Sequence, residues 1–157
     1  MKKNNSRQNN PRVTVKLRPY LREFLICKLQ DEEGFSSRKS IIGAMLEPLL
    51  ESNPNGYVPQ SPCRDSFTFT IPYKFNGKNC AFHTMYISEH NQRLFERMLY
   101  LYFKDVFHSY VEDKQRYMKE IKACILMFCS DYHITFNAIN YESLKKSYYR
   151  YSQKKNV

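Results

Sequence analysis

Residues 12–30 read RVTVKLRPYLREFLICKLQ, and the period of the hydrophobic pattern changes at Pro19. Before the proline, apolar and polar residues alternate, which predicts a half-buried strand with Val13, Val15 and Leu17 facing inward. After it, apolar residues recur at helical spacing, and proline is favoured in the first turn of a helix. We therefore expect a strand that leads directly into a helix over 20–30.

A second helix is expected after the DEEG segment at 31–34, with Ser36 or Ser37 as its N-cap. Its apolar face consists of Ile41, Ile42, Met45, Leu46, Leu49 and Leu50. Pro48 removes a helical hydrogen bond, so this helix should kink or stop at Glu47. Residues 53–64 contain three prolines and predict a linker.

Beyond the linker, Phe67, Phe69 and Ile71 alternate with polar residues, and Asn76-Gly77 separates them from a second apolar run at 81–87. An Asn-Gly pair between two such runs predicts a β-hairpin. Helices are expected at 89–111, 114–132 and 141–153. The predicted fold is α+β, with a strand-helix-helix unit at 12–52 and then a β-hairpin packed on a mainly helical unit over 65–153. Residues 1–11 and 154–157 are expected to be a flexible basic arm and a tail.

Residues 12–52 resemble a ribbon-helix-helix DNA-binding domain in their order of strand, proline, helix, glycine-containing turn and Ser-capped helix. The resemblance implies a homodimer whose paired strands enter the major groove of DNA. Thr14, Lys16 and Arg18 would contact base edges, and a two-residue period independently puts them on one face. The implied phosphate contacts are Arg12, Ser37, Arg38 and Lys39. The alternative is that the strand joins an ordinary sheet and both helices are core elements.

The formal charge of +10 is concentrated at the two ends of the 157-residue chain. Residues 1–22 hold seven basic residues and residues 143–157 hold five, without an acid in either segment. The remainder has 13 basic and 15 acidic residues. Two cationic ends around a near-neutral body suit a polyanion-binding protein, because neutralising phosphates releases counterions. Solvated tails are the alternative for the first ten residues.

The segment 121–153 is loosely similar to a helix-turn-helix outline, in which the shared apolar positions are Ile125, Phe128, Ile134, Ile139 and Leu144. Its connection is longer than the usual three or four residues. Within its last helix we expect a second basic surface, made of Lys145, Lys146, Tyr149 and Arg150, because charge and aromatic rings together suit nucleic acids. The alternative is an amphipathic helix whose lysines are simply solvated.

Catalytic and metal chemistry have little support in the residues. The chain has only four glycines, so there is no phosphate-cradling glycine-rich loop, and its four histidines form no compact motif. A zinc site would require joining Cys80 and His83 to Cys124, Cys129 and His133 across the fold, since a Cys-x-x-Cys pair is missing. We therefore expect no enzyme activity, no cofactor and no metal.

The five cysteines are an odd number without regular spacing, which favours reduced thiols in the cytoplasm. Neither a signal peptide nor a membrane-spanning run is expected.

Together these features predict a double-stranded DNA-binding protein, either sequence-specific or accessory, of phage or bacterial origin. It would act as a transcriptional regulator or as a replication or mobile-element accessory factor. RNA is the alternative nucleic acid. The rival class is a protein-binding module, such as an inhibitor, an antitoxin or a virion-associated factor, with basic ends.

Overall fold

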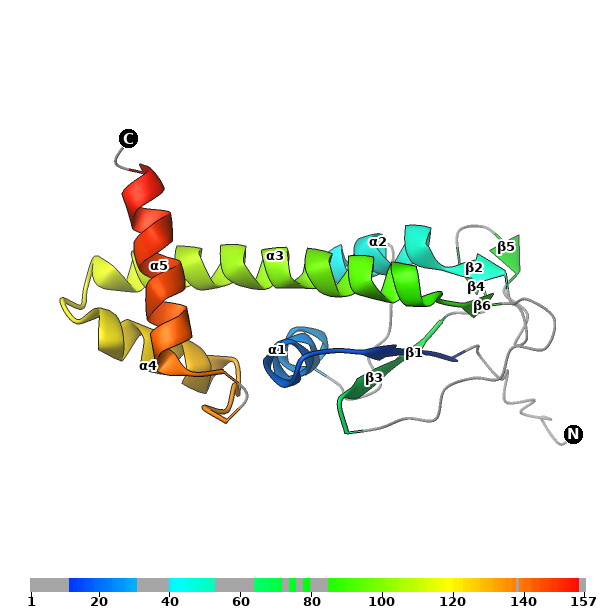
Figure 1. Ribbon diagram of the computed structural model, residues 1–157, viewed down its shortest axis with the longest axis horizontal. Helices are drawn as coiled ribbons and strands as arrows, with labels where there is room; N and C mark the ends of the chain where they lie inside the picture. The colour runs from blue at the N-terminus through cyan, green and yellow to red at the C-terminus, as the bar shows by residue number, and fades with distance from the viewer. Residues whose placement is uncertain are drawn as a thin grey trace, which may run out of the picture. The chain divides into compact units, whose positions relative to one another are not determined.

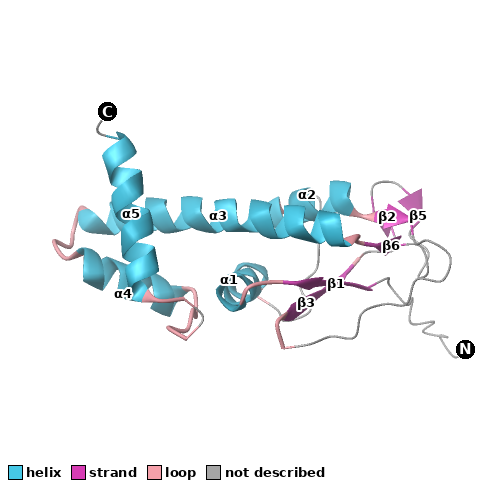
Figure 2. Ribbon diagram, viewed as in Figure 1, coloured by secondary structure: helices cyan, strands magenta, loops and turns pink. Residues whose placement is uncertain are grey.

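The computed structural model describes residues 12–30, 40–52, 64–71, 74–75, 78–79, 85–137 and 139–155. The chain divides into two compact units, Met1–Lys16 with Asp31–Phe95 and Leu17–Gln30 with Glu96–Val157. All described strands belong to the first unit, whereas the described elements of the second are helices (Figure 2). This mixture confirms the predicted α+β class. The predicted linker lies outside the described residues except for Arg64, and the domain boundaries built on it stay predictions.

Strand β1 (Arg12–Lys16) is antiparallel to β3 (Ser66–Thr70), with Val15 opposite Phe67 (Figure 1). Val13, Val15, Phe67 and Phe69 are buried, so the alternation expected for both segments is confirmed. The Phe67 and Phe69 rings lie 4.8 Å apart, and Phe69 packs edge-on against Phe95. The core of the first unit therefore contains apolar side chains of both strands and of the helix that follows them.

Two short strands pair on either side of Asn76-Gly77, which itself lies outside the described residues. β4 (Lys74–Phe75) pairs with β5 (Lys78–Asn79) across that dipeptide. β2 (Glu51–Ser52) pairs with β6 (Met85–Tyr86), and β3 pairs with β1. The expected pairing of 67–71 with 81–87 was therefore wrong. Turn chemistry locates a chain reversal, whereas the partner of a longer apolar strand depends on burial between segments distant in sequence.

Helix α2 (Ile41–Leu46) begins after Ser40, whose Oγ accepts a hydrogen bond from the Gly43 N–H at 2.9 Å. Ser40 is thus the N-cap instead of Ser36 or Ser37, which lie outside the described residues. A 3₁₀ turn, η1 (Glu47–Leu49), follows directly and contains Pro48. The predicted stop at Glu47 is confirmed, because a proline cannot continue the helical hydrogen-bond pattern.

Helix α3 (Glu89–Gln115) contains residues of both units and extends four residues past its expected end. Ser88 caps it, since the Ser88 Oγ accepts from the Asn91 N–H at 3.4 Å. Its most deeply buried side chains recur every four residues: Phe95, Leu99, Phe103, Phe107 and Val111. At about 3.6 residues per turn this spacing forms an apolar stripe that winds slowly around the helix.

The second unit contains α1 (Pro19–Leu29), the later part of α3, α4 (Ile121–Asp131) and α5 (Tyr141–Lys155). Its core is aromatic: the Phe103 ring lies 5.3 Å from Phe24 and 5.8 Å from Phe128. The helix expected from Lys114 begins only at Ile121, because Arg116 and Tyr117 instead form a turn on the last residues of α3. Among the described residues, no helix combines the length and apolarity needed to span a membrane.

Candidate nucleic-acid interface

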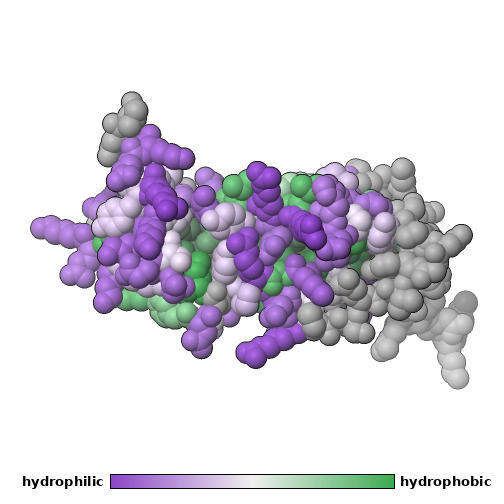
Figure 3. All heavy atoms as spheres, viewed as in Figure 1, coloured by the Kyte–Doolittle hydropathy of each residue, from purple (hydrophilic) through white to green (hydrophobic). Residues whose placement is uncertain are grey.

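Helix α5 is attached to α3 through its tyrosines. Leu144 and Tyr148 are buried, and the Tyr148 hydroxyl donates to Gln115 Oε1 at 2.5 Å. Burial raises the pKa of Tyr148 above its ordinary value of 10. The Tyr151 hydroxyl donates to Glu112 Oε2 at 3.0 Å. These contacts place one face of α5 on the core and leave its polar faces toward solvent, where Figure 3 shows hydrophilic side chains.

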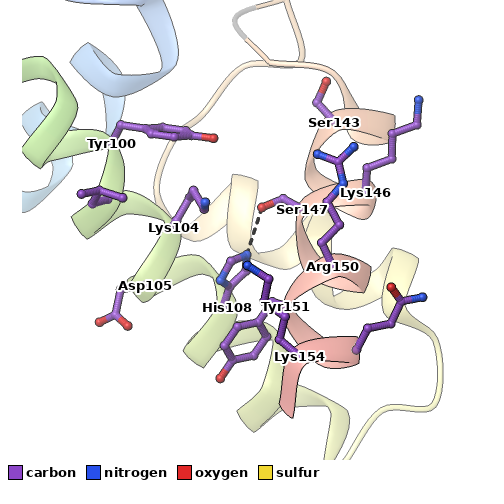
Figure 4. A pocket seen from close by; sticks show the side chains of 12 residues that line it. Tyr100, Lys104, Asp105, His108, Ser143, Lys146, Ser147, Arg150, Tyr151 and Lys154 are labelled. Carbon is purple, nitrogen blue, oxygen red and sulfur yellow. Dashed lines mark hydrogen bonds between the residues drawn. The ribbon is translucent and has the colours of Figure 1, made fainter. Parts of the chain in front are cut away.

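A groove of about 990 Å³ separates α5 from α3, and we call it the basic groove. From α3 it is lined by Tyr100, Leu101, Lys104, Asp105 and His108. From α5 it is lined by Ser143, Lys146, Ser147, Arg150, Tyr151, Gln153 and Lys154 (Figure 4). Most of the α5 residues recur at intervals of three or four, so they lie on one face of the helix.

The basic groove carries four cations against one acid. Lys146, Arg150 and Lys154 follow one another at four-residue intervals, which spaces their backbones about 6 Å apart along the helix axis. Lys104 points toward α5 from the opposite wall, whereas Asp105 points away from it (Figure 4). The lining of the groove therefore has an excess of positive charge, and three of its four cations come from successive turns of α5.

His108 forms part of the groove wall and connects the two helices. Its side chain is 7% exposed, its Nε2 lies 3.0 Å from Ser147 Oγ, and its ring stacks on Tyr151 at 4.4 Å. Burial, assisted by the Lys104 ammonium, holds the pKa of His108 below its usual value. The imidazole is thus neutral at neutral pH, and the positive charge of the groove comes from its lysines and arginine.

A second, smaller cavity of about 320 Å³ adjoins the basic groove, and we call it the aromatic pocket. The two cavities share Tyr100, Lys104, Ser143 and Ser147. The residues that line only the aromatic pocket are Tyr20, Phe103, Ile139, Asn140 and Leu144. The lining thus changes from charged to largely apolar from one cavity to the next.

No protein-family model, curated protein or solved structure matches this chain.

The predicted second basic surface is divided between two faces of α5. Lys146 and Arg150 line the basic groove, but Lys145 and Tyr149 do not. The Lys145 ammonium lies 5.8 Å from the Tyr141 ring, and the Tyr149 side chain is exposed. Sequence reasoning missed Lys154, whose spacing from Lys146 and Arg150 was a usable signal. It also missed Lys104, Tyr100 and His108, which are distant from α5 in the sequence.

The predicted base-contact residues lie on different elements. Thr14 is half-buried on β1, and its Oγ1 lies 3.0 Å from Thr68 Oγ1. Lys16, the last residue of β1, is exposed, and its backbone N–H donates to Gln92 Oε1 at 3.4 Å. Arg18 is the N-cap residue of α1. Among the predicted phosphate contacts, Arg12 begins β1, whereas Ser37, Arg38 and Lys39 lie outside the described residues.

The Arg18 side chain already has partners within the second unit. Its Nε lies 3.0 Å from Glu96 Oε1, and its guanidinium lies 4.8 Å from the centre of the Tyr100 ring. A guanidinium with an acid on one side and a ring on the other is held in place by both. Its role as a base contact stays a prediction.

The resemblance of 121–153 to a helix-turn-helix also stays a prediction, although its apolar positions can be placed. Ile125, Phe128, Ile134 and Leu144 are buried, and Ile139 is partly exposed. Residues 132–140 connect the two helices. Asn140 caps α5, because its Oδ1 accepts from the Ser143 N–H at 2.7 Å. The connection is also tied to α1, since Glu23 accepts hydrogen bonds from the N–H and hydroxyl of Thr135.

Two of the three cysteines that the structure describes belong to packing, whereas Cys27 is partly exposed and its Sγ lies 3.7 Å from the Asp131 carbonyl oxygen. Cys124 and Cys129 are buried free thiols, and burial raises the pKa of Cys129 to about 11. A thiol with that pKa is a poor nucleophile and metal ligand at neutral pH. In the described part of the chain, no group of three or more His, Cys, Asp or Glu side chains is arranged to hold a metal ion. Cys80 and His83 lie outside that part.

Proposed function

We propose that this protein binds double-stranded DNA, and that the basic groove holds the phosphate backbone of one strand. The observation that carries the proposal is the arrangement of Lys104, Lys146, Arg150 and Lys154 around one groove with a single acid, Asp105. Four positive side chains in one groove attract a polyanion strongly, because each neutralised phosphate releases counterions.

The spacing of the cations favours a regular anionic ligand. Lys146, Arg150 and Lys154 are about 6 Å apart along α5, and the phosphates of one DNA strand are about 3.4 Å apart along the duplex axis. The two intervals between the three cations therefore cover about 12 Å, a length of three to four spacings between successive phosphates. Hydroxyl groups such as those of Ser143 and Tyr100 are frequent partners of phosphate and sugar oxygens.

The biological role that suits these features is a non-enzymatic DNA-binding factor of the cytoplasm, acting in transcription, replication or mobile-element maintenance. The polar face of β1, with Thr14 and Lys16, is a second candidate DNA surface on the first unit. Dimerisation through that strand, as the ribbon-helix-helix resemblance implies, is part of the same proposal. Sedimentation equilibrium of the full chain with and without DNA would test it.

The main experiment is a salt titration of binding to a random duplex of about 30 base pairs. The logarithm of the association constant falls linearly with the logarithm of the salt concentration. A variant with Lys104, Lys146, Arg150 and Lys154 all replaced by Gln should make this slope shallower by about 4, or about 1 for each lost phosphate contact. The matched control replaces four exposed cations outside the groove: Arg93, Arg116, Lys119 and Lys122.

The two variants remove the same net charge, so only a difference between them supports the groove. The groove variant should bind more weakly than the control at every salt concentration. Equal weakening would mean that DNA responds to net charge alone, and an unchanged affinity of the groove variant would refute the proposal. A far-ultraviolet circular dichroism spectrum of each variant verifies that it is folded.

Protein binding is the second candidate function, favoured by apolar side chains left exposed on the second unit. Leu126 and Met127 on α4 are 40% and 36% exposed, and Phe136 in the following connection is 49% exposed. Exposed apolar groups on a surface are common at protein interfaces. If the wild-type protein binds no DNA even at low salt, this candidate becomes the leading one.

A further inference from the structure

The aromatic pocket adjoins the cations of the basic groove. Lys104 lines both cavities, and its ammonium lies 5.2 Å from the centre of the Tyr100 ring, which is also shared. The Tyr100 ring is held from a further direction by the Arg18 guanidinium at 4.8 Å. A ligand with an anionic part near Lys104 would therefore have an ordered aromatic wall immediately next to it.

The lining of the aromatic pocket fits a flat, weakly polar group. Tyr20, Tyr100, Phe103, Ile139 and Leu144 supply aromatic and aliphatic surface. Its volume of about 320 Å³ is at the lower end of the range of small-molecule pockets, roughly 300–1,000 Å³. Such a cavity suits one ring system better than a base pair.

One polar side chain of the pocket can recognise the edge of that ring system. The Asn140 Oδ1 accepts the Ser143 N–H as the cap of α5, which fixes the orientation of the amide. The Asn140 NH₂ group can then donate a hydrogen bond to an acceptor on the edge of a base. Positive groups bind the phosphate of a nucleotide, aromatic rings stack on its base, and an amide can hydrogen-bond to the edge of the base. The two adjacent cavities contain all three kinds of group.

We infer that the aromatic pocket takes one unpaired base of the DNA strand whose phosphates lie in the basic groove. This inference rests on the proposed function. A base inside a duplex is stacked and paired, so it reaches such a pocket only when it is already unpaired or is turned out of the helix. The protein should accordingly prefer DNA that contains an unpaired nucleotide over a fully paired duplex.

The test compares two DNA ligands by fluorescence anisotropy: a random duplex of about 30 base pairs, and the same duplex with one unpaired thymidine at its centre. The wild-type protein should bind the second roughly 5- to 150-fold more tightly, the range expected for stacking one base on aromatic side chains.

Two variants change residues that line the aromatic pocket but not the basic groove. Ile139→Trp fills the cavity from its partly exposed wall, and Asn140→Asp keeps the cap acceptor of α5 but removes the amide donor. Both should reduce the preference for the unpaired nucleotide to about twofold or less, while Ile139→Val, the matched control, should retain it. A thermal melt of each variant verifies that it is folded.

The outcomes separate the inference from the proposed function. If the wild-type protein binds both DNA ligands with equal affinity, the base pocket is refuted and DNA binding stands. If it binds neither, the proposed function fails and the inference fails with it. A preference that survives in both Ile139→Trp and Asn140→Asp would also overturn the inference, because the unpaired base would then lie elsewhere.

Discussion

At the scale of single residues, a positively charged side chain stabilises the fold at one position and is available to a ligand at another. The Lys28 ammonium lies between 5.1 and 5.8 Å from the rings of Phe24, Tyr102 and Tyr132, a contact that stabilises α1 on its neighbours. Lys146 and Arg150, by contrast, line an open groove. A count of positive residues cannot make this distinction, because it depends on which rings the fold places nearby.

His108 makes a residue-scale prediction about pH. The pKa of His108 is lowered in the folded protein from an ordinary value of 6.5, so the unfolded chain binds a proton more readily than the folded one. Its contribution to the free energy of unfolding should therefore be fully present above about pH 6.5 and decline as the pH falls toward the folded-state pKa. Thermal unfolding of wild type and His108→Gln at several pH values would measure it.

In that comparison the wild-type melting temperature should fall more steeply below about pH 6.5 than that of His108→Gln, each taken relative to its own value at neutral pH. Parallel profiles would show that protonation of His108 does not differ between the folded and unfolded states.

At the scale of elements, the shortest strands organise the start of the longest helix. Glu51 of β2 accepts hydrogen bonds from the hydroxyls of Tyr86 at 3.0 Å and Ser88 at 2.8 Å, and from the Asn91 amide. Asn91 also donates to the Leu49 carbonyl at 3.0 Å. The Glu51 carboxylate thus joins β2 and β6 to the first turn of α3, where the helix dipole favours negative charge, and Asn91 joins η1 to the same turn.

Replacement of Glu51 by Ala should lower the free energy of unfolding by about 1–3 kcal/mol, because it leaves several partly buried donors without their acceptor. Urea denaturation would measure the loss. The matched control is Glu89→Ala, also at the start of α3, whose carboxylate is exposed and pairs only with Arg93 among the described contacts. That change should cost no more than about 1 kcal/mol. Equal losses would mean that Glu51 acts only through the helix dipole.

At the scale of the whole molecule, positive charge is present both in the N-terminal segment and on α5. Residues 1–11 contribute Lys2, Lys3 and Arg7, and the basic groove contributes four further cations. Because salt dependence counts the phosphates that are neutralised, contributions from separate segments to the slope should add.

Deletion of residues 1–11 should make the slope of the log association constant against log salt concentration shallower by at most about 3. Combined with the four groove substitutions, it should make the slope shallower by at most about 7. The measurement is the same salt titration with the duplex. If the groove variant alone abolished all salt dependence, the N-terminal cations would have no part in binding.

The sequence by itself determined the local structure wherever periodicity or stereochemistry leaves one choice. The period-two run at 12–17, the proline at the start of α1 and the stop before Pro48 all follow from rules acting within a few residues. The pairing of β4 with β5 on either side of Asn76-Gly77 and the long apolar stripe of α3 also follow from such local rules. Lys146 and Arg150 could be selected as candidates because charge and helical spacing are visible in the chain.

Only the tertiary structure decided which distant segments meet. In the folded protein β1 pairs with β3, and Arg18 contacts Glu96 and the Tyr100 ring. Lys104, Tyr100 and His108 of α3 lie beside α5. The physical reason is that such contacts depend on burying apolar faces against one another across long separations in sequence, and local patterns do not encode the choice of partner. The candidate groove is a product of that choice, since its two walls are separated in the chain by α4.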